Sequence, residues 1–552
     1  MSDRSEYILL STLWSQERDN GLVFNTYCPI DPRTGFRSVV GCAALMHAQI
    51  LYYWAEKGYQ FGLTLTASDS YKTETRRIFI CELKSYAYDY GLFSEISEQL
   101  ATVDAGTDDD IAALCYACGV LIKSDYTSSA TSATMTDDVY VRAGFDSFKA
   151  VSSEENPLFF HTIGSGSHRV TKITDAGWEI IADNLSQGLV IACGSSELSH
   201  ALVMDGYNPE DGTYHLNFGW GRSNRRLFKG DTGTGWYTKE EIDDFDFFRI
   251  YIDICPECDP DTVFTVTDTA EYGVGTLARI IEQAGGIRNG GTADVPEELA
   301  EESFEVFSVL PEAETDLTVK NLRGDIRIRP SNSNALSGES DAMKTAFSSA
   351  ASLTIENFAA DFSAVNSYGP VTAVQAADRL VIDSLNGVVA ANSYSASYGL
   401  LSKKSMSVTL ENGGIFAGTY TVSVASGQSA VTNICSALEQ FSGEGRISAL
   451  GTINDFGRGY AVSSGDGDDM LALTGKSAVI GAVSLAGGRN TISIESGSYL
   501  HGCISADAGS LCLNMKLTDS TADALYEPDF MPGSSREGDY IVHPGVASLI
   551  SS

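Results

Sequence analysis

Residues 41–54 read GCAALMHAQILYYW, and this stretch decides how the first half of the chain folds. From Cys42 onward, apolar residues recur at helical spacing, so we predict a helix that begins at the cysteine. A cysteine thiol has an ordinary pKa of about 8.5, and the unpaired N–H groups at a helix start favour its thiolate form. Cys42 is therefore our candidate nucleophile.

Two later stretches supply a candidate base. Residues 199–207 read SHALVMDGY and predict a buried strand with His200 at its upstream end. Residues 215–220 read HLNFGW and predict a second strand that runs into a turn, and NPEDG (208–212) between them favours a hairpin. Such a hairpin brings Asn217 beside His200. We therefore predict that His200 is the general base and that the Asn217 amide orients its imidazole.

An acyl-transfer site also needs hydrogen-bond donors for the oxyanion. Gln16 is the upstream candidate, paired with the backbone N–H of Cys42. The alternatives are that Asn217 only forms a turn and that Gln16 is a surface residue. We interpret His47 and His215 as structural.

These motifs occur in an order that resembles a known family. The residues that carry the resemblance are Trp14, Gln16, Phe24-Asn25, Cys28-Pro29, Gly41-Cys42, Ala48-Gln49-Ile50, His200-Ala201, Asp205-Gly206-Tyr207 and Asn217 through Gly221. Over residues 10–255 the chain resembles the streptopain family of papain-like cysteine peptidases. The resemblance implies an α+β papain-like peptidase domain that acts on protein or peptide substrates. It also implies substrate contacts at Trp220, Ser199 and Tyr126.

The chain departs from this family pattern in two places near the site. Streptopain relatives usually have glycine before the histidine, where this chain has Ser199, and tryptophan after the asparagine, where it has Phe218. Neither change removes a reacting group. The family is made with a signal peptide and an inhibitory propeptide, and we expect neither in the printed sequence, which begins without a basic segment and apolar core.

The second half follows a different pattern. Short strings of alternating apolar residues, separated by Gly, Ser, Asn and Asp, recur at 317–330, 352–364, 379–391, 406–424 and 477–506. Each string is too short to bury a face alone, so we predict stacked rungs of a β-solenoid, with a sandwich of short antiparallel strands as the alternative. Residues 264–286 resemble the opening of right-handed parallel β-helices, in which a helix, here near 276–284, caps the core. The tail resembles passenger regions of bacterial surface and autotransporter-like proteins.

These patterns predict a multidomain chain: a peptidase domain at 1–256, a linker at 257–263 and an all-β right-handed parallel β-helix at 264–552. CPECDPDT (255–262) is polar and contains prolines, as expected of a connection.

Composition limits the partners. The formal net charge is −37, which argues against nucleic acid binding and suits a solvated surface in a secreted or salt-exposed setting. The family resemblance implies a secreted or cell-surface bacterial protein. No run is long and apolar enough for a transmembrane segment.

We predict no cofactor and no metal ion. Eleven cysteines are too few for a disulfide scaffold, and the pairs Cys115/Cys118 and Cys255/Cys258 are too far apart in sequence for a zinc ribbon. We therefore predict that these two pairs are local disulfides or thiols. GDGDDML (465–471) fits one calcium-binding nonapeptide turn, but it lacks the second turn that closes such a site, so a solvated turn is favoured.

The sequence therefore predicts a cysteine endopeptidase with a β-solenoid that displays it or binds a surface ligand. The alternative is an inactive surface or adhesin protein that retains a peptidase-like domain.

Overall fold

The structure is a computed structural model of the 552-residue chain. It describes residues 5–16, 23–59, 61–63, 65–80, 108–146, 148–153, 156–221, 233–259, 261–305, 307–329, 343–366, 369–393, 396–418, 459–475, 477–495, 498–501, 504–506, 511–516 and 525–527. Parts of three predicted strings, at 330, 419–424, 496–497 and 502–503, lie outside the described residues. The chain divides into two compact units, Met1–Cys258 and Asp259–Ser552.

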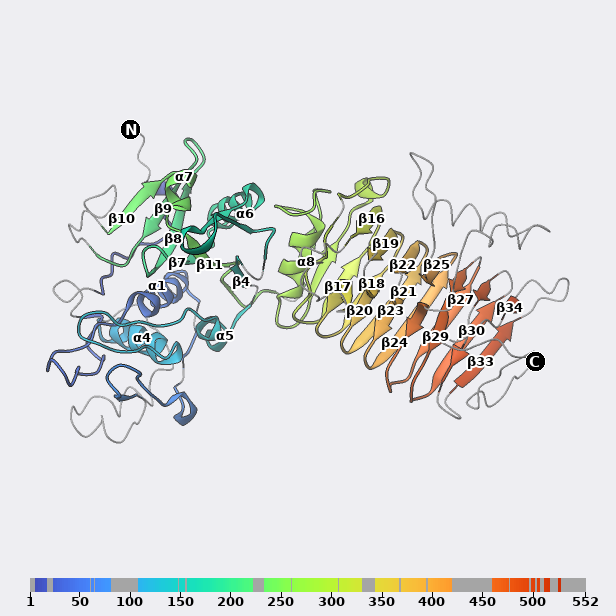
Figure 1. Ribbon diagram of the computed structural model, residues 1–552, viewed down its shortest axis with the longest axis horizontal. Coiled ribbons are helices and arrows are strands. Elements are labelled where there is room, and N and C mark those ends of the chain that lie inside the picture. The colour runs from blue at the N-terminus through green and yellow to red at the C-terminus, as the bar shows by residue number, and fades with distance from the viewer. Residues whose placement is uncertain are drawn as a thin grey trace. The chain divides into compact units, whose positions relative to one another are not determined.

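The first unit contains a six-stranded antiparallel sheet in the order β10-β9-β8-β7-β11-β4 (Figure 1). Its strands are β4 (Lys149–Ser152), β7 (Ile191–Ser195), β8 (His200–Asn208), β9 (Thr213–Asn217), β10 (Thr234–Tyr237) and β11 (Phe247–Ile252). The predicted hairpin is present as β8 and β9, with Val203 aligned to Asn217. A register shift between Met204 and Gly206 breaks the regular pairing of this hairpin.

Helix α1 (Cys42–Glu56) is the central helix of this unit. It begins where the prediction placed it, because Gly41 before it has a φ of 89°, outside the helical region. It ends before Gly58, whose φ of 90° is again left-handed. Helix α1 packs between α4 (Asp108–Leu121) and the strands β7 and β8, and this explains why it is apolar on nearly every side (Figure 1).

The remaining elements of the first unit are short or peripheral. They are the 3-10 helices η1 (Ser5–Tyr7), η2 (Ala67–Asp69) and η3 (Gly166–His168), the helices α5 (Asp138–Ala143), α6 (Asp175–Ser186) and α7 (Lys239–Asp243), and the strand pairs β1 (Tyr71–Lys72) with β2 (Phe79–Ile80), β3 (Phe145–Asp146) with β12 (Cys255–Pro256), and β5 (Phe160–Ile163) with β6 (Val170–Ile173). Helix α6 begins at a Thr174 cap whose hydroxyl accepts the N–H of Gly177.

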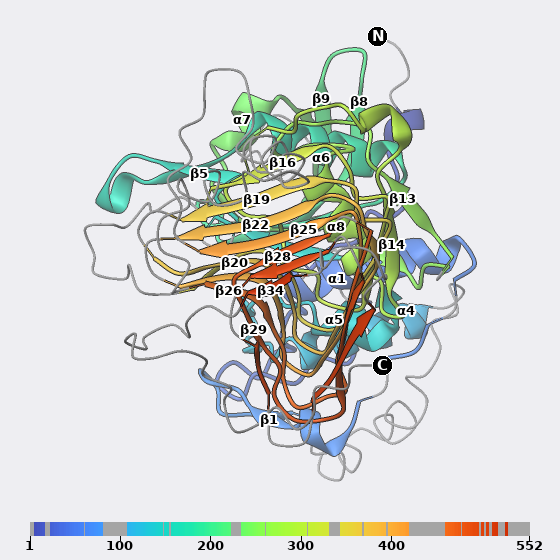
Figure 2. The ribbon, with the colours of Figure 1, turned by 90° about the vertical axis from the view of Figure 1, so that its right-hand side faces the viewer.

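The second unit consists of three sheets of parallel strands. The first has the order β13-β14-β15-β18-β21-β24-β27-β30-β33, the second β16-β19-β22-β25-β28-β31-β34 and the third β17-β20-β23-β26-β29-β32. From β16 onward, successive strands of the chain visit the three sheets in turn, so each circuit adds one strand to every sheet. Figure 2 shows these sheets as separate walls of stacked strands.

The strands of this unit are β13 (Val263–Thr265), β14 (Gly291–Asp294), β15 (Leu317–Lys320), β16 (Asp325–Ile328), β17 (Lys344–Ser349), β18 (Leu353–Glu356), β19 (Asp361–Asn366), β20 (Val371–Ala376), β21 (Arg379–Leu385), β22 (Val388–Ser393), β23 (Ser397–Ser402), β24 (Ser405–Glu411), β25 (Gly414–Gly418), β26 (Gly459–Ser463), β27 (Met470–Thr474), β28 (Ala478–Ile480), β29 (Ala482–Ser484), β30 (Asn490–Glu495), β31 (Tyr499–His501), β32 (Ile504–Ser505), β33 (Leu511–Lys516) and β34 (Leu525–Glu527). Pairs between these named strands are parallel, so the described strands do not form the antiparallel sandwich considered as an alternative.

Stacking in register explains the alternating strings. Leu317 aligns with Leu353, and Leu353 aligns with Leu380, all completely or almost completely buried. Polar side chains stack as well: the Asn357 amide donates to the Asn321 side chain over 2.9 Å. Both asparagines have positive φ, which asparagine tolerates better than most residues. This hydrogen bond connects the asparagine side chains of two neighbouring rungs.

Helix α8 (Leu277–Gly285) lies between β13 and β14 in sequence, where a capping helix was predicted. Its N-cap Thr276 hydroxyl accepts the N–H of Arg279, and its apolar residues Leu277, Ile280 and Ile281 are buried. The helix contacts β13, β14 and β15, the first strands of the first sheet. A fourth 3-10 helix, η4 (Glu297–Leu299), follows β14.

The acidic turn at 465–471 contacts protein donors. Asp469 accepts the backbone N–H of Met406 over 2.7 Å, and Asp468 accepts the N–H of Arg489 over 2.8 Å. These carboxylates therefore tie neighbouring rungs together. Within the described residues, no group of three or more His, Cys, Asp or Glu side chains is arranged to hold a metal ion. The described helices include none with the length and apolar character needed to cross a membrane.

Candidate active site

Cys42 is the first residue of α1, partly buried at the helix N-terminus. Burial by itself would raise the pKa of the Cys42 thiol. The hydrogen bond and the charge of His200, together with the N–H groups of Ala201 and Ala43, outweigh burial and hold that pKa below its ordinary value. The structure thus places a thiol, a helix start and an imidazole together, as the sequence predicted for a thiolate nucleophile.

His200 is the first residue of β8, and its side chain is buried. One ring nitrogen, Nε2, lies 2.6 Å from the backbone carbonyl oxygen of Phe218. A carbonyl oxygen can only accept, so Nε2 carries the hydrogen of this bond. The other nitrogen is then left to exchange a proton with the Cys42 sulfur.

Asn217 does not contact the imidazole in the way we predicted. Its amide nitrogen donates to the Thr12 carbonyl over 2.9 Å, and its amide oxygen accepts the N–H of Gly219 over 3.0 Å. Both ends of the amide are therefore used to hold the turn around Phe218, whose carbonyl faces His200. Asn217 thus holds the turn whose Phe218 carbonyl contacts the His200 ring, one step removed from the contact predicted from sequence.

Gln16 is placed at the edge of this turn by backbone pairing. Its N–H donates to the Gly219 carbonyl over 3.1 Å, and the N–H of Gly221 donates to the Trp14 carbonyl over 2.9 Å. The segment carrying Gln16 therefore runs beside the turn that follows Asn217.

Asn25 is a supporting residue to which the sequence analysis gave no role. Its amide nitrogen donates to the Gln16 carbonyl over 3.4 Å. Its amide oxygen accepts the N–H of Val40, two residues before Cys42, over 2.7 Å. Asn25 thus links the Gln16 segment to the start of α1. Its place within the family-like FN pair was the only sequence signal for it.

Gly219 allows the turn to approach α1 closely. Its φ of 67° favours glycine, and a Cβ atom there would lie 2.9 Å from the Cδ2 atom of Leu45. Any side chain at this position would push the turn away from the helix that carries Cys42.

Trp220 and Ser199 flank the histidine. The Trp220 ring lies 4.8 Å from the His200 ring, centroid to centroid, and it stacks on Phe218 at 5.0 Å. Ser199 is exposed and has a φ of 46°. A non-glycine residue in this region costs about 1 kcal/mol, and this explains physically why glycine suits the position. The N–H and hydroxyl of Ser199 both donate to the Ser196 carbonyl and hold the turn.

Tyr126 must be corrected as a substrate-binding candidate. Its side chain is completely buried and stacks on Tyr116 with ring centroids 6.1 Å apart. A Cβ atom at Gly119 of α4 would lie 2.2 Å from the Tyr126 hydroxyl oxygen, so the ring fills the space that this glycine leaves. Tyr126 belongs to the hydrophobic core, where a substrate does not reach it.

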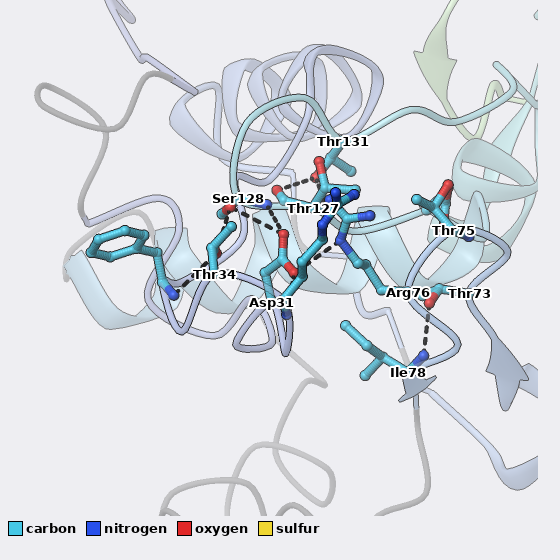
Figure 3. A network of polar contacts seen from close by, with 12 residues as sticks. Asp31, Thr34, Thr73, Thr75, Arg76, Ile78, Thr127, Ser128 and Thr131 are labelled. Atoms are coloured by element: carbon cyan, nitrogen blue, oxygen red, sulfur yellow. Dashed lines mark hydrogen bonds and ion pairs between the residues drawn. The ribbon is translucent and has the colours of Figure 1, made fainter.

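A buried carboxylate, Asp31, organises the loop that leads to Cys42 (Figure 3). It accepts the backbone N–H and hydroxyl of Ser128 over 3.0 Å each and the Nε–H of Arg76 over 2.9 Å. Burial alone would raise the pKa of Asp31, but these donors and the N–H of Arg33 lower it well below its usual range. Asp31 therefore joins the 31–38 loop, the 127–131 loop and the arm between β1 and β2.

The 127–131 loop in turn holds the residues just before Cys42. Val39 donates its N–H to the Thr127 carbonyl over 3.0 Å, and its own carbonyl accepts the Thr131 hydroxyl over 2.6 Å. A Cβ atom at Gly41 would lie 3.0 Å from the Thr131 side chain. The position of Cys42 thus depends on a loop that Asp31 fixes.

We expect Asp31→Asn to lower the free energy of unfolding of the first unit by about 2–4 kcal/mol, because an amide NH₂ would face donors that now meet a carboxylate. Urea unfolding followed by tryptophan fluorescence measures this unit alone, since all five tryptophans lie before residue 237. The exposed Asp244→Asn is the control and should change little. An unchanged midpoint for Asp31→Asn would contradict this role.

Comparison with known proteins agrees with the motifs. Residues 14–226 match the sequence model of the Peptidase C10 family. Two solved structures from Prevotella intermedia are similar. The active wild-type interpain A cysteine protease is 20% identical (TM-score 0.29), and the match covers 46% of this chain and 98% of that one. A prointerpain A fragment is 18% identical (TM-score 0.29), with coverage of 47% and 76%. No curated protein matches the chain. Residues 14–226 thus match the Peptidase C10 family, which is the streptopain family of cysteine peptidases that the motifs resemble.

Proposed function

We propose that this chain is a cysteine endopeptidase in which Cys42 is the nucleophile and His200 the general base and acid. The observation that carries the proposal is the hydrogen bond between the His200 imidazole and the Cys42 sulfur at the start of α1, which lowers the pKa of the thiol. The match of residues 14–226 to a cysteine peptidase family supports the same reaction.

The proposed reaction has two halves. The Cys42 thiolate attacks the carbonyl carbon of the scissile peptide bond, and the protonated His200 then gives its proton to the leaving amine. This leaves a thioester on Cys42. His200 next takes a proton from water, and the resulting hydroxide attacks the thioester carbon. The C–S bond then breaks, which releases the carboxylic acid product and regenerates the Cys42 thiolate and the protonated His200. The Phe218 carbonyl holds the imidazole in the tautomer that this exchange needs.

The oxyanion formed in each half requires donors. The N–H of Cys42 has no acceptor within the helix, because it belongs to the first residue of α1. We assign the second donor to the side chain of Gln16, whose backbone is fixed beside the turn by Gly219 and Asn25. We assign Trp220 and Ser199, which flank His200, to the substrate-binding surface.

We further propose the setting in which the enzyme works. Its substrates are proteins or peptides, and it is a secreted or cell-surface bacterial protein. The net charge of −37 supports a solvated extracellular surface.

For the second unit we propose a right-handed parallel β-helix that displays the peptidase or binds a surface ligand. From β16 onward, consecutive strands belong to the three parallel sheets in rotation, and this supports the proposed architecture. We also propose that residues 1–256 and 264–552 are separate domains joined by 257–263. The division of the chain at Cys258 supports a boundary there.

The alternative function, an inactive surface or adhesin protein with a peptidase-like domain, predicts a Cys42 that does not react. Labelling with an epoxide or vinyl-sulfone thiol probe separates the two. We expect the full chain to be labelled rapidly at one site, and Cys42→Ala to lose this labelling. The matched control is Cys512→Ala, which removes an exposed cysteine of the second unit and should leave the rapid labelling intact.

The same labelling assay tests whether the first unit alone contains the complete active site. A chain of residues 1–258 should fold and be labelled at Cys42 at the rate of the full chain. If it folds by circular dichroism and is not labelled, the second unit takes part in the site, and our assignment of chemistry to the first unit alone is wrong. If neither chain is labelled, the alternative of an inactive protein holds.

A further inference from the structure

A second pair of sulfur atoms lies outside the candidate active site. Cys255 and Cys258, in the sequence Cys-Pro-Glu-Cys, are both thiols, and their Sγ atoms are 3.6 Å apart. Both side chains are partly buried, with Cys258 the last residue of the first unit. A disulfide needs the sulfurs at about 2.05 Å, so oxidation would require a local approach and no rearrangement of distant elements.

One residue, Asp146, already holds the chain in the required turn. Cys255 pairs with Asp146 between β12 and β3, and its thiol lies 3.6 Å from the Asp146 carbonyl oxygen. At the other end of the tetrapeptide, the N–H of Cys258 donates to the Asp146 carboxylate over 3.3 Å. Asp146 is itself 2% exposed. Both cysteines are thus anchored on one buried residue, which keeps the two sulfurs facing each other.

We propose that Cys255 and Cys258 form a redox-active dithiol that closes to an intramolecular disulfide by exchange with a small-molecule disulfide such as oxidised glutathione. The thiolate of one cysteine attacks a sulfur of the small disulfide, forms a mixed disulfide and releases one thiolate. The second cysteine loses its proton and attacks the protein sulfur of the mixed disulfide, releasing the second thiolate. The two protein thiols are oxidised, and one small disulfide is reduced to two thiols.

The order of attack follows from the surroundings of the two sulfurs. The hydrogen bond with Cys258 and then burial raise the pKa of the Cys255 thiol, so Cys255 keeps its proton and is the poorer first nucleophile of the pair. Cys258 is therefore the attacking sulfur, and Cys255 resolves the mixed disulfide.

The other Cys-x-x-Cys pair of the chain provides an internal comparison. Cys115 and Cys118 have the same spacing within α4, but both are completely buried, and burial raises the pKa of each thiol. They should not react in the folded protein. Sequence spacing alone does not distinguish the two pairs, whereas exposure and the Asp146 anchor do.

The experiment uses the full chain carrying Cys42→Ala and Cys512→Ala, which removes the candidate nucleophile and an exposed thiol. The protein is equilibrated in buffers of graded reduced-to-oxidised glutathione ratio, its thiols are alkylated in acid, and peptides are mapped by mass spectrometry. We expect the peptide containing 255 and 258 to lose two hydrogens, without bound glutathione, and to regain them with dithiothreitol. In Cys255→Ser, Cys258 should stop at the glutathione mixed disulfide.

Two results would overturn the proposal: a 255–258 peptide that remains fully alkylated in oxidised buffer, or one that accumulates glutathione with Cys255 intact. Alkylation of Cys115 and Cys118 after denaturation should be unchanged throughout. Oxidation should also raise the melting temperature seen by tryptophan fluorescence, since the disulfide closes a turn that already exists. None of these measurements depends on peptidase activity, so their failure is distinct from a failure of the proposed function.

Discussion

His200→Ala is expected to lower kcat/KM for an unfolded protein substrate by about three orders of magnitude or more, because it removes the group that we propose activates Cys42 and protonates the leaving amine. Without the imidazole, the hydrogen bond and charge that lower the pKa of the Cys42 thiol are also lost. The exposed His161→Ala is the matched control and should retain the parent rate.

Asn217→Ala should be milder than His200→Ala, with a loss of about tenfold, because the Phe218 carbonyl remains to bind the imidazole. Its position would be less fixed without the bonds to Thr12 and Gly219. Asn217→Asp separates these bonds, since aspartate can still accept the Gly219 N–H but cannot donate to the Thr12 carbonyl. Equal losses in His200→Ala and Asn217→Ala, with both proteins folded, would show that the asparagine acts directly on the base.

The sequence predicted the parts of the site that depend on pattern. The helix start at Cys42, the strand start at His200 and the hairpin before Asn217 all follow from apolar spacing and turn residues. The acceptor on His200 could not be predicted in the same way, because it is a backbone carbonyl and every residue has one. The structure identifies it, because the Phe218 carbonyl oxygen lies 2.6 Å from Nε2 of His200.

The sequence also did not predict which side chains near the candidate site are buried. Tyr126 occupies a loop that resembles the cleft of the family, yet its ring fills the space beside Gly119. Asp31 shows the converse, since a lone aspartate in a loop carries no signal of the donors that surround it. In the second unit, alternation predicted short strands but left parallel and antiparallel pairing open, because pairing direction depends on long-range register.

His47 should make the first unit sensitive to mild acid. It lies on α1 five residues after Cys42, is completely buried, and neither ring nitrogen has a hydrogen-bond partner among the described residues. Its ring lies 4.9 Å from the Tyr140 ring and 6.4 Å from the Tyr251 ring. Burial lowers the pKa of His47 to about 3, because a buried imidazolium would lack solvation.

Between pH 6.5 and pH 3 the unfolded chain therefore binds a proton at His47 that the folded chain does not bind. In the unfolded chain His47 has the ordinary histidine pKa of about 6.5. The contribution of neutral His47 to the free energy of unfolding is therefore fully present above pH 6.5 and is lost as the pH falls from 6.5 towards 3. The expected loss is about 2 kcal/mol at pH 5 and about 4 kcal/mol at pH 3. Urea unfolding by tryptophan fluorescence between pH 7 and pH 5 measures it, in a range where most carboxylates remain ionised.

The variant His47→Phe should flatten this dependence, because a phenylalanine keeps an aromatic ring against Tyr140 and binds no proton in either state. Its stability at pH 7 can shift with packing, so the test is the slope of the free energy of unfolding against pH. Met46→Leu, a buried change of similar volume on the same helix, should shift the stability and keep the parent slope. If His47→Phe keeps the parent slope as well, protonation of His47 in the unfolded chain is not what destabilises this unit in acid. The loss would then arise from the other histidines or from carboxylates, and the burial of His47 would have no thermodynamic effect in this range.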